Sequence, residues 1–353
     1  MDKKDIKSMN LGELKKDMEE LGEKAFRATQ VYEWIHVKLV QSFDEMTNIS
    51  EKLKEKLREK YNFTTLEIVD KQVSAQDGTA KYLFRLQDGN LIESVLMKYK
   101  HGNSVCISSQ AGCRMGCKFC ASTIAGLKRN LFPSEMLEQI YRIQRESGER
   151  VSNVVVMGTG EPFDNYDNLI RFLKLLTDEK GLHISARNIT VSTCGIVPKI
   201  REFAEENMQV TLAISLHAPN NEKRKRMMPI ANKYSIEELL DACRYFFEKT
   251  GRRITFEYSL ADGVNDSEQD AAELISLVKG MNCHVNLIPI NPVEELEFEG
   301  SAKKVAEKFK NKLEKSRINV TIRREMGRDI DGACGQLRRK FDGAVREEGT
   351  KEC

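Results

Sequence analysis

The sequence has no run of about 18 consecutive apolar residues, the length that a membrane-spanning helix needs. Its first residues, Met1–Asp5, lack the apolar core of a signal peptide. The formal net charge is only +2, so composition alone does not indicate a nucleic-acid-binding protein. We therefore expect a cytoplasmic protein with no membrane partner, in which any affinity for RNA comes from local basic patches.

A disulfide framework is also missing. The nine cysteines are an odd number in a chain of 353 residues, and we interpret them as thiols that the cytosol keeps reduced. Hydrophobic residues make up 40% of the chain and charged residues 31%, which is typical of a soluble globular protein. The length suffices for one large α/β domain and a smaller module.

Three of the cysteines form one motif. Cys113, Cys117 and Cys120 are spaced Cys-x3-Cys-x2-Cys. Three thiolates can hold three irons of a 4Fe-4S cluster and leave the fourth iron open for a small molecule, whereas four cysteines would indicate an electron-transfer cluster. Zinc is the main alternative, but it prefers a fourth protein ligand and usually two Cys-x2-Cys pairs. The sequence has no second such pair, so we predict a cluster held by these three residues.

The N-terminal third divides into two patterns. Apolar residues between 11 and 60 recur at helical spacing, and Ser50 is a plausible helix start, so this part predicts a small helical bundle. Residues 66–73, 80–86 and 91–97 are rich in β-formers. Asp88-Gly89 lies between the last two of these segments and predicts a hairpin turn.

From residue 104 onward, strand and helix patterns alternate. The predicted strands cover residues 104–108, 153–157, 188–192, 211–216, 254–259, 285–289 and 319–323. The predicted helices cover residues 134–148, 166–178, 197–207, 235–249, 267–280 and 301–316. Six consecutive β/α units predict a parallel sheet with right-handed crossovers. The periodicity does not distinguish an open doubly wound sheet from a partial barrel.

Small polar residues follow several of these strands, where parallel sheets bind their ligands. Taken singly, each is an ordinary cap or turn residue more often than a ligand. The positions are Gly160, Glu161, Ser192, Ser215, Leu216, His217 and Asn291.

The cysteine spacing is similar to that of the radical S-adenosylmethionine (SAM) enzymes, and the whole chain resembles the RlmN-type adenine-C2 RNA methyltransferases. The strongest segments are residues 91–131, 154–163, 188–195, 211–219, 283–292 and 318–337. The resemblance implies an α/β fold, a radical SAM partial (β/α)6 barrel with a small N-terminal helical module and a short β extension. It implies a helical accessory module at 1–62, a β extension at 63–100, a catalytic domain at 101–345 and a tail at 346–353.

The resemblance also implies the cofactors and their sites. SAM would coordinate the open iron of the 4Fe-4S cluster, and the seven positions that follow the strands would bind it, Glu161 contacting the methionine amino group. The string Gly327–Leu337 contains Cys334, which in this family carries the methyl group. Cys106 would then release a covalent RNA adduct through a transient disulfide.

Glu93 has apolar neighbours at both adjacent and alternate positions, which predicts a half-buried carboxylate. Burial raises the pKa of a carboxyl group and suits a general base. An edge-strand glutamate facing water is the alternative. The family resemblance places the proton-abstracting acid at Glu93.

In the implied mechanism two SAM molecules are used in each turnover. The first methylates Cys334, and a radical made from the second takes hydrogen from that methyl group. The carbon then adds to adenine C2, Glu93 removes the ring proton, and Cys106 resolves the product. The implied substrates are nucleotide 2503 of 23S rRNA, free or in an assembling subunit, and adenosine 37 of tRNA. An external reductant such as flavodoxin or ferredoxin would supply electrons to a monomeric enzyme.

Basic segments near the strand ends suggest a groove for the RNA backbone, although charge runs are more often just solvated surface. They are Lys128-Arg129, Lys223–Arg226, Arg252-Arg253, Arg323-Arg324 with Arg328, and Arg338–Lys340. The remaining single cysteines, Cys194, Cys243, Cys283 and Cys353, match no catalytic position of the family. Three alternatives stay open: a sibling enzyme that methylates C8 of the same adenine, a radical SAM activase, and a non-catalytic zinc-bound RNA-binding module.

Overall fold

The computed structural model describes residues 3–290, 298–330 and 337. Asn291, Cys334 and Cys353 lie outside the described residues, as do the basic residues 338–340. No described helix is long and apolar enough to cross a membrane.

The N-terminal residues form the expected helical module with a hydrophobic core of its own. Its helices are α1 (Leu11–Glu20), α2 (Ala25–His36) and α3 (Glu51–Lys60). The Ser50 hydroxyl accepts a hydrogen bond from the Leu53 N–H, which confirms the predicted start of α3. The short strands β1 (Lys4–Asp5) and β2 (Tyr61–Asn62) pair in parallel and bring the two ends of the module together.

The main sheet has ten strands in the order β14-β13-β12-β11-β10-β9-β6-β5-β4-β3. The neighbours from β6 to β14 pair in parallel, whereas β3, β4, β5 and β6 pair antiparallel. The parallel strands are β6 (Gly102–Cys106), β9 (Val151–Val156), β10 (Ile189–Thr193), β11 (Thr211–Ser215), β12 (Ile254–Leu260), β13 (Cys283–Pro289) and β14 (Asn319–Ile322). The other three are β3 (Glu67–Val73), β4 (Ala80–Arg85) and β5 (Leu91–Tyr99). The predicted β extension and the run of parallel strands are both confirmed.

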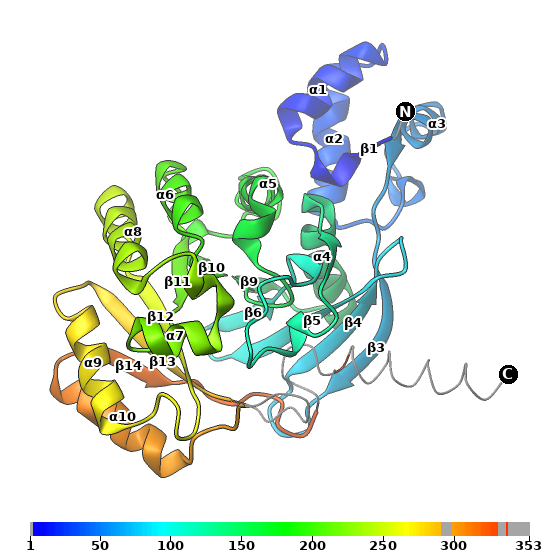
Figure 1. Cartoon of the computed structure of the whole chain (residues 1–353). Coiled ribbons are helices and arrows are strands. Elements are labelled where there is room, and N and C mark those ends of the chain that lie inside the picture. The colour runs from blue at the N-terminus through cyan, green and yellow to red at the C-terminus, as the bar shows by residue number, and fades with distance from the viewer. Residues whose placement is uncertain (1–2, 291–297, 331–336, 338–353) are drawn as a thin grey trace, which may run out of the picture.

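Each predicted crossover helix is present within a few residues of its expected bounds. They are α4 (Pro133–Ser147), α5 (Tyr166–Leu176), α6 (Val197–Glu205), α8 (Ile236–Thr250), α9 (Glu268–Val278) and α10 (Lys303–Lys315). Figure 1 shows α4, α5, α6 and α8 in a row along one face of the sheet. The chain thus forms the expected partial (β/α)6 barrel, with free sheet edges at β14 and β3 among the described residues.

Several elements were not predicted, among them a hairpin around the cysteine motif and a short helix after β11. The cysteine motif lies in a loop between β7 (Gln110–Gly112) and β8 (Leu127–Asn130), which pair antiparallel. Gly112 has a φ of 82°, and a Cβ atom there would meet the Gly126 carbonyl oxygen at 1.9 Å, so this hairpin requires glycine. A short helix, α7 (Asn221–Met227), follows β11.

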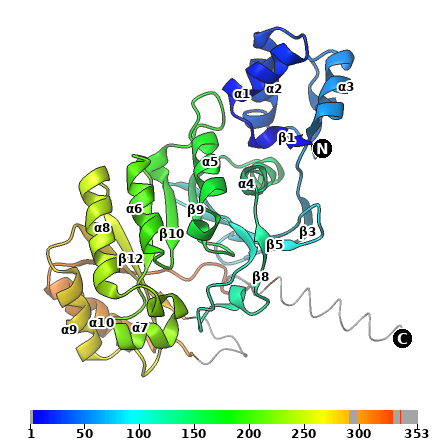
Figure 2. The ribbon, with the colours of Figure 1, turned by 45° about the horizontal axis from the view of Figure 1, so that its top comes forward.

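The N-terminal module rests on α4 and α5, as Figure 2 shows. Lys7 Nζ lies 2.5 Å from Glu138 Oε2, and neither side chain has exposed area. Tyr32 donates to Asp178 at 2.9 Å, and His36 Nδ1 lies 2.8 Å from the Tyr141 hydroxyl. These buried polar contacts hold the module in one orientation on the barrel.

Candidate cluster and SAM site

A cavity of about 220 Å³ opens where the parallel strands end. Eight of the residues expected to bind the cluster or SAM line it: Cys113, Cys117, Cys120, Gly160, Glu161, Ser192, Ser215 and His217. They come from the ends of three successive strands, β9, β10 and β11, and from the loop between β7 and β8. Distant parts of the sequence therefore meet at one site.

The three cysteines form one wall of this cavity. Cys113 and Cys117 are 6% and 9% exposed, and Cys120 is half-buried. The Cys113 N–H donates to Gly126 O, and the Thr123 hydroxyl donates to Cys120 O, which holds the loop around the thiols. Burial raises the pKa of Cys113 to about 12 and raises the pKa of Cys117 as well. A bound cation would have to replace these protons.

The spacing of the thiols bears on which metal fits. Within the described residues, no group of three His, Cys, Asp or Glu side chains is placed to hold a single metal ion. A tetrahedral zinc brings its sulfurs to within about 4 Å of one another, because each Zn–S bond is about 2.3 Å. A four-iron cluster needs only three thiolates when its fourth iron is left open, and three cysteines are the donor set that the cavity presents.

Glu161 is the buried carboxylate of the site, at 4% exposure. Its Oε1 accepts from the Phe163 N–H at 3.0 Å and its Oε2 from the Cys194 N–H at 2.7 Å. Burial raises the pKa of Glu161, although these hydrogen bonds oppose that effect. No described lysine or arginine forms an ion pair with it. A carboxylate oriented in this way fits an ammonium group of a ligand.

Gly160 lines the cavity, and packing against a neighbouring strand also requires glycine at this position. Its φ is 109°, and a Cβ atom would lie 2.6 Å from Gln110 Cβ and 2.8 Å from the Gln110 nitrogen. The glycine therefore lets the loop after β9 pack against the start of β7. This packing places Glu161 beside the cysteines.

His217 is held as a neutral imidazole. Its Nδ1 accepts from the Ser259 N–H at 2.9 Å, so Nε2 is the nitrogen that carries the proton. Burial, helped by the charge of Arg224, lowers the pKa of His217 to about 3. Its φ is 54°, and its carbonyl accepts from Asn265 Nδ2 at 2.7 Å. Leu216 beside it is fully buried and lies outside the cavity lining, where its carbonyl accepts from Arg224.

Sequence reasoning missed several lining residues, of which Glu257 is the clearest. It is 4% exposed, lies on β12, and its Oε2 accepts from Asn286 Nδ2 at 2.8 Å. Burial raises the pKa of Glu257. A lone acid in the apolar strand Ile254–Leu260 is the same signal that selected Glu93, so the sequence could have indicated it.

Glu93 and Cys106 lie on β5 and β6, outside the residues that line the cavity. Glu93 is only 4% exposed, which is more buried than predicted and excludes the water-facing alternative. Its Oε2 lies 3.2 Å from Nζ of Lys81, which has no exposed area and which the sequence did not single out. Cys106 is 5% exposed.

The segment that precedes Cys334 is attached to the β extension. The Asp329 carboxylate accepts from the Ser74 hydroxyl at 2.6 Å and from the Ala75 N–H at 2.8 Å. The Gly327 N–H donates to Asp77 at 3.0 Å. The turn between β3 and β4 therefore fixes the path of residues 327–329.

The predicted basic groove is wrong in part. Arg224 is fully buried, so it is not available to a phosphate, and Lys223 pairs with Asp270 at 2.6 Å. Arg129 pairs with Glu135 and Asp88. Arg252-Arg253 precede β12 and therefore lie at its amino end, away from the cavity. Lys128, Lys225 and Arg324 are exposed, and Arg323 lines the cavity.

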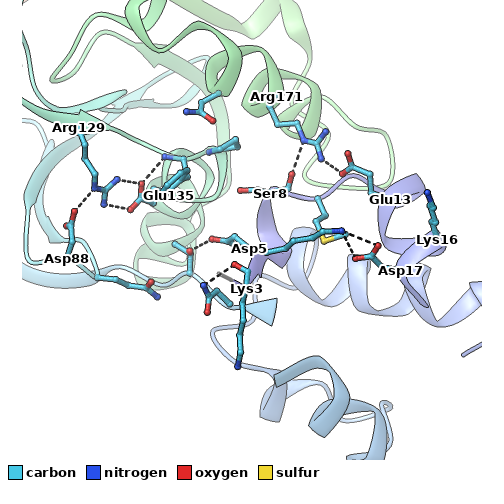
Figure 3. Close-up of a pocket in the computed structure, with 18 of the residues that line it drawn as sticks. Lys3, Asp5, Ser8, Glu13, Lys16, Asp17, Asp88, Arg129, Glu135 and Arg171 are labelled. Carbon is cyan, nitrogen blue, oxygen red and sulfur yellow. Dashed lines mark hydrogen bonds and ion pairs between the residues drawn. The ribbon is translucent and has the colours of Figure 1, made fainter. Parts of the chain in front are cut away.

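A second, larger cavity of about 1000 Å³ lies between the module and the barrel. Figure 3 shows that its acidic and basic side chains face one another. Arg171 bonds to Ser8 O and Glu13, Arg129 to Asp88 and Glu135, and Lys4 to Asp17. Most of its charge is thus neutralised internally, and none of the predicted site residues lines it.

Comparisons with known proteins show what the chain as a whole is similar to. The radical SAM superfamily model matches residues 107–275, and the model of the ribosomal RNA large subunit methyltransferase N-terminal domain matches residues 4–62. The chain is 68% identical to a probable dual-specificity RNA methyltransferase RlmN of Lachnospira eligens, covering 96% of both chains. It is 60% identical to the protein of that name from Lachnoclostridium phytofermentans, again over 96% of both. The crystal structure of a radical SAM methyltransferase from Sphaerobacter thermophilus superimposes with a TM-score of 0.90 at 43% identity, covering 94% of this chain and 98% of that one.

Proposed function

The chain belongs to the RlmN family of radical SAM RNA methyltransferases, and from that premise we propose that it methylates C2 of adenosine in both 23S rRNA and tRNA. The observation that carries the proposal is the meeting of three cysteines, Glu161, Ser192, Ser215 and His217 in one cavity at the strand ends. The names of the relatives, which specify dual-specificity RNA methyltransferases, support two RNA substrates.

The residues that line the cavity divide into two roles. Cys113, Cys117 and Cys120 would hold the 4Fe-4S cluster, which would supply the electron for the reductive cleavage of SAM. Glu161 accepts from the ammonium of SAM, since its oxygens are already oriented by two backbone N–H groups. Gly160, Ser192, Ser215, Leu216, His217 and Asn291 complete the SAM site, and neutral His217 donates through Nε2.

Three residues handle the methyl carbon and the RNA. Cys334 carries the carbon as S-methylcysteine, which requires one SAM for the methyl group and a second for hydrogen abstraction. Glu93 removes the ring proton, and Cys106 releases the product through a transient disulfide with Cys334. The Ser74 and Asp77 contacts hold residues 327–329, which precede Cys334 in the sequence.

The same premise extends to partners and location. We propose that residues 1–62 form an RNA-binding module, that 63–100 link it to the catalytic part at 101–345, and that 346–353 are a tail. The enzyme acts as a cytoplasmic monomer that receives electrons from flavodoxin or ferredoxin.

The test uses anaerobically reconstituted protein, a reductant and methyl-deuterated SAM with unmodified 23S rRNA and tRNA transcripts. Mass spectrometry of the digested RNA should find deuterated 2-methyladenosine in both. Deuterated 8-methyladenosine would assign the protein to the sibling activity instead. SAM cleavage without methylated adenosine would contradict the proposed substrate.

Variants test the assigned cysteines. Cys334→Ala should cleave SAM and yield no methylated RNA, and Cys106→Ala should accumulate a covalent protein–RNA adduct. Cys283→Ala is the matched control, since Cys283 is buried at the amino end of β13, and it should leave methylation unchanged. A fully active Cys334→Ala enzyme would overturn the mechanism.

A further inference from the structure

Arg224 is a fully buried arginine on α7, beside the cluster site. We propose that its guanidinium is the internal positive charge of that site and raises the reduction potential of the bound cluster. The inference rests on the proposed ligands Cys113, Cys117 and Cys120. The basic segment Lys223–Arg226 suggested that Arg224 contacts RNA at the surface, whereas this proposal gives it a role inside the protein.

The guanidinium joins the ends of two strands. Nη2 donates to Cys194 O at 2.7 Å and to Ser215 O at 3.3 Å, and Nε donates to Leu216 O at 3.2 Å. These carbonyls follow or end β10 and β11. A Cβ atom at Gly195 would lie 3.2 Å from Nη2, so the glycine leaves room for the guanidinium.

The charge has no carboxylate partner among the described residues, because only backbone carbonyls accept from it. Its Nη1 is buried and makes no hydrogen bond to the described chain. Burying an unpaired cation costs free energy, which indicates that the Arg224 guanidinium interacts with a negatively charged group when the site is occupied. The groups that act on it electrostatically are the thiols of Cys194, Cys117 and Cys243.

The charge of Arg224 lies in buried, apolar surroundings, where water and salt screen it little. Cys117, Cys194, Ala218, Met227 and Met228 belong to one buried apolar cluster, which includes the last residue of α7 and Cys194, whose carbonyl accepts from Arg224. The Lys118 N–H donates to Met227 O at 2.9 Å, which attaches α7 to the cysteine loop. Interactions between charges are stronger in such an environment than at the surface, where water and salt screen them.

The sign of the effect follows from the charge of the cluster. A four-iron cluster with three thiolates becomes more negative by one charge when it accepts an electron. A nearby cation therefore stabilises the reduced state more than the oxidised state and raises the potential. Its removal should lower the potential, and its replacement by another cation should not.

The test compares Arg224→Gln, which removes the charge, with Arg224→Lys, which keeps the charge but loses the forked hydrogen bonds. Lys225→Gln is the matched control, because Lys225 is the exposed neighbour on the same helix. Each protein is reconstituted anaerobically without RNA. Iron and sulfide content, thermal unfolding and the reduction potential, followed by the EPR signal of the reduced cluster, are measured.

We expect Arg224→Gln to lower the ratio of reduced to oxidised cluster at least tenfold at a fixed potential, a shift of about 59 mV for one electron. Arg224→Lys should stay within about threefold of the parent protein while unfolding at a lower temperature. Lys225→Gln should change neither quantity.

Three other results would overturn the inference. An Arg224→Gln protein with full iron content and an unchanged potential overturns the inference alone. If that variant does not fold, an Arg224→Lys protein whose ratio of reduced to oxidised cluster falls tenfold at the same fixed potential overturns the inference, because the charge is still present there. A parent protein that takes up no cluster would overturn the proposed ligands and this inference with them.

Discussion

The buried ion pair between Lys7 and Glu138 makes a sharp prediction about stability. Replacing Lys7 by methionine keeps the length of the side chain but leaves Glu138 without its cation. We expect the free energy of unfolding to fall by about 3–5 kcal/mol, the usual cost of removing one partner from a buried pair.

The magnitude follows from burial rather than from the short distance. Both side chains have no exposed area, and the second Glu138 oxygen already has no hydrogen-bond partner in the described chain. Burial raises the pKa of Glu138 and lowers that of Lys7, so the burial opposes both charges. The exposed pair Lys98–Glu149, at 3.0 Å, is the comparison, and Lys98→Met should cost less than about 1 kcal/mol.

Urea unfolding of the two single variants, Lys7→Met and Lys98→Met, and of the double variant Lys7→Met/Glu138→Met measures these energies. The double variant should recover most of the loss, because it removes both buried charges. Fluorescence of Trp34, the one tryptophan of the chain, reports on the module, and circular dichroism reports on the whole protein. A loss below 1 kcal/mol in Lys7→Met, or a double variant no more stable than the single one, would refute the reasoning.

Three further outcomes are expected. Burial lowers the pKa of both His36 and His217 to about 3, so the unfolded chain binds protons that the folded chain does not. The free energy of unfolding should therefore fall as the pH drops from about 6.5 toward 3, by up to about 1.4 kcal/mol per pH unit for each histidine. Urea titrations of His36→Gln between pH 6.5 and 5 should show a smaller dependence of that free energy on pH. Glu161→Gln should weaken SAM binding to the reconstituted protein by about 10- to 100-fold in equilibrium dialysis, because hydrogen bonds to charged groups contribute about 1.5–3 kcal/mol. Unchanged binding would contradict the proposed contact between Glu161 and the ammonium group of SAM. Gly160→Ala should lower the melting temperature and the cluster content together, because its Cβ has no room beside Gln110.

Local patterns were sufficient for the barrel, since each strand is a short apolar segment and each helix has an apolar face and often a cap. The capping box of Ser235 and Glu238 on α8 and the left-handed Gly251 at its end are examples. The cysteine motif and the polar strand ends also predicted residues that meet in one cavity, because parallel strands bring their carboxyl ends to the same edge.

Partners across the chain were harder to predict. Asn221–Met227 reads as a charged surface segment, and only the carbonyls at the ends of β10 and β11 make a buried site for Arg224. Lys81 is the partner of Glu93, which lies directly opposite Leu83 in the hairpin. Residues on diagonal positions of neighbouring strands can touch, so the predicted Asp88-Gly89 turn and its register could have indicated Lys81.

The docking of the N-terminal module has a consequence for the order in which the protein folds during synthesis. Strand β1 meets β2 once residue 62 has left the ribosome, so the module can close early. Lys7, however, is 131 residues away from Glu138. At about 5–20 residues per second, the ribosome needs on the order of ten seconds to make the intervening chain. Until α4 emerges, Lys7 of the nascent module stays in water. The Lys7 side chain becomes fully buried only when the module docks on the barrel.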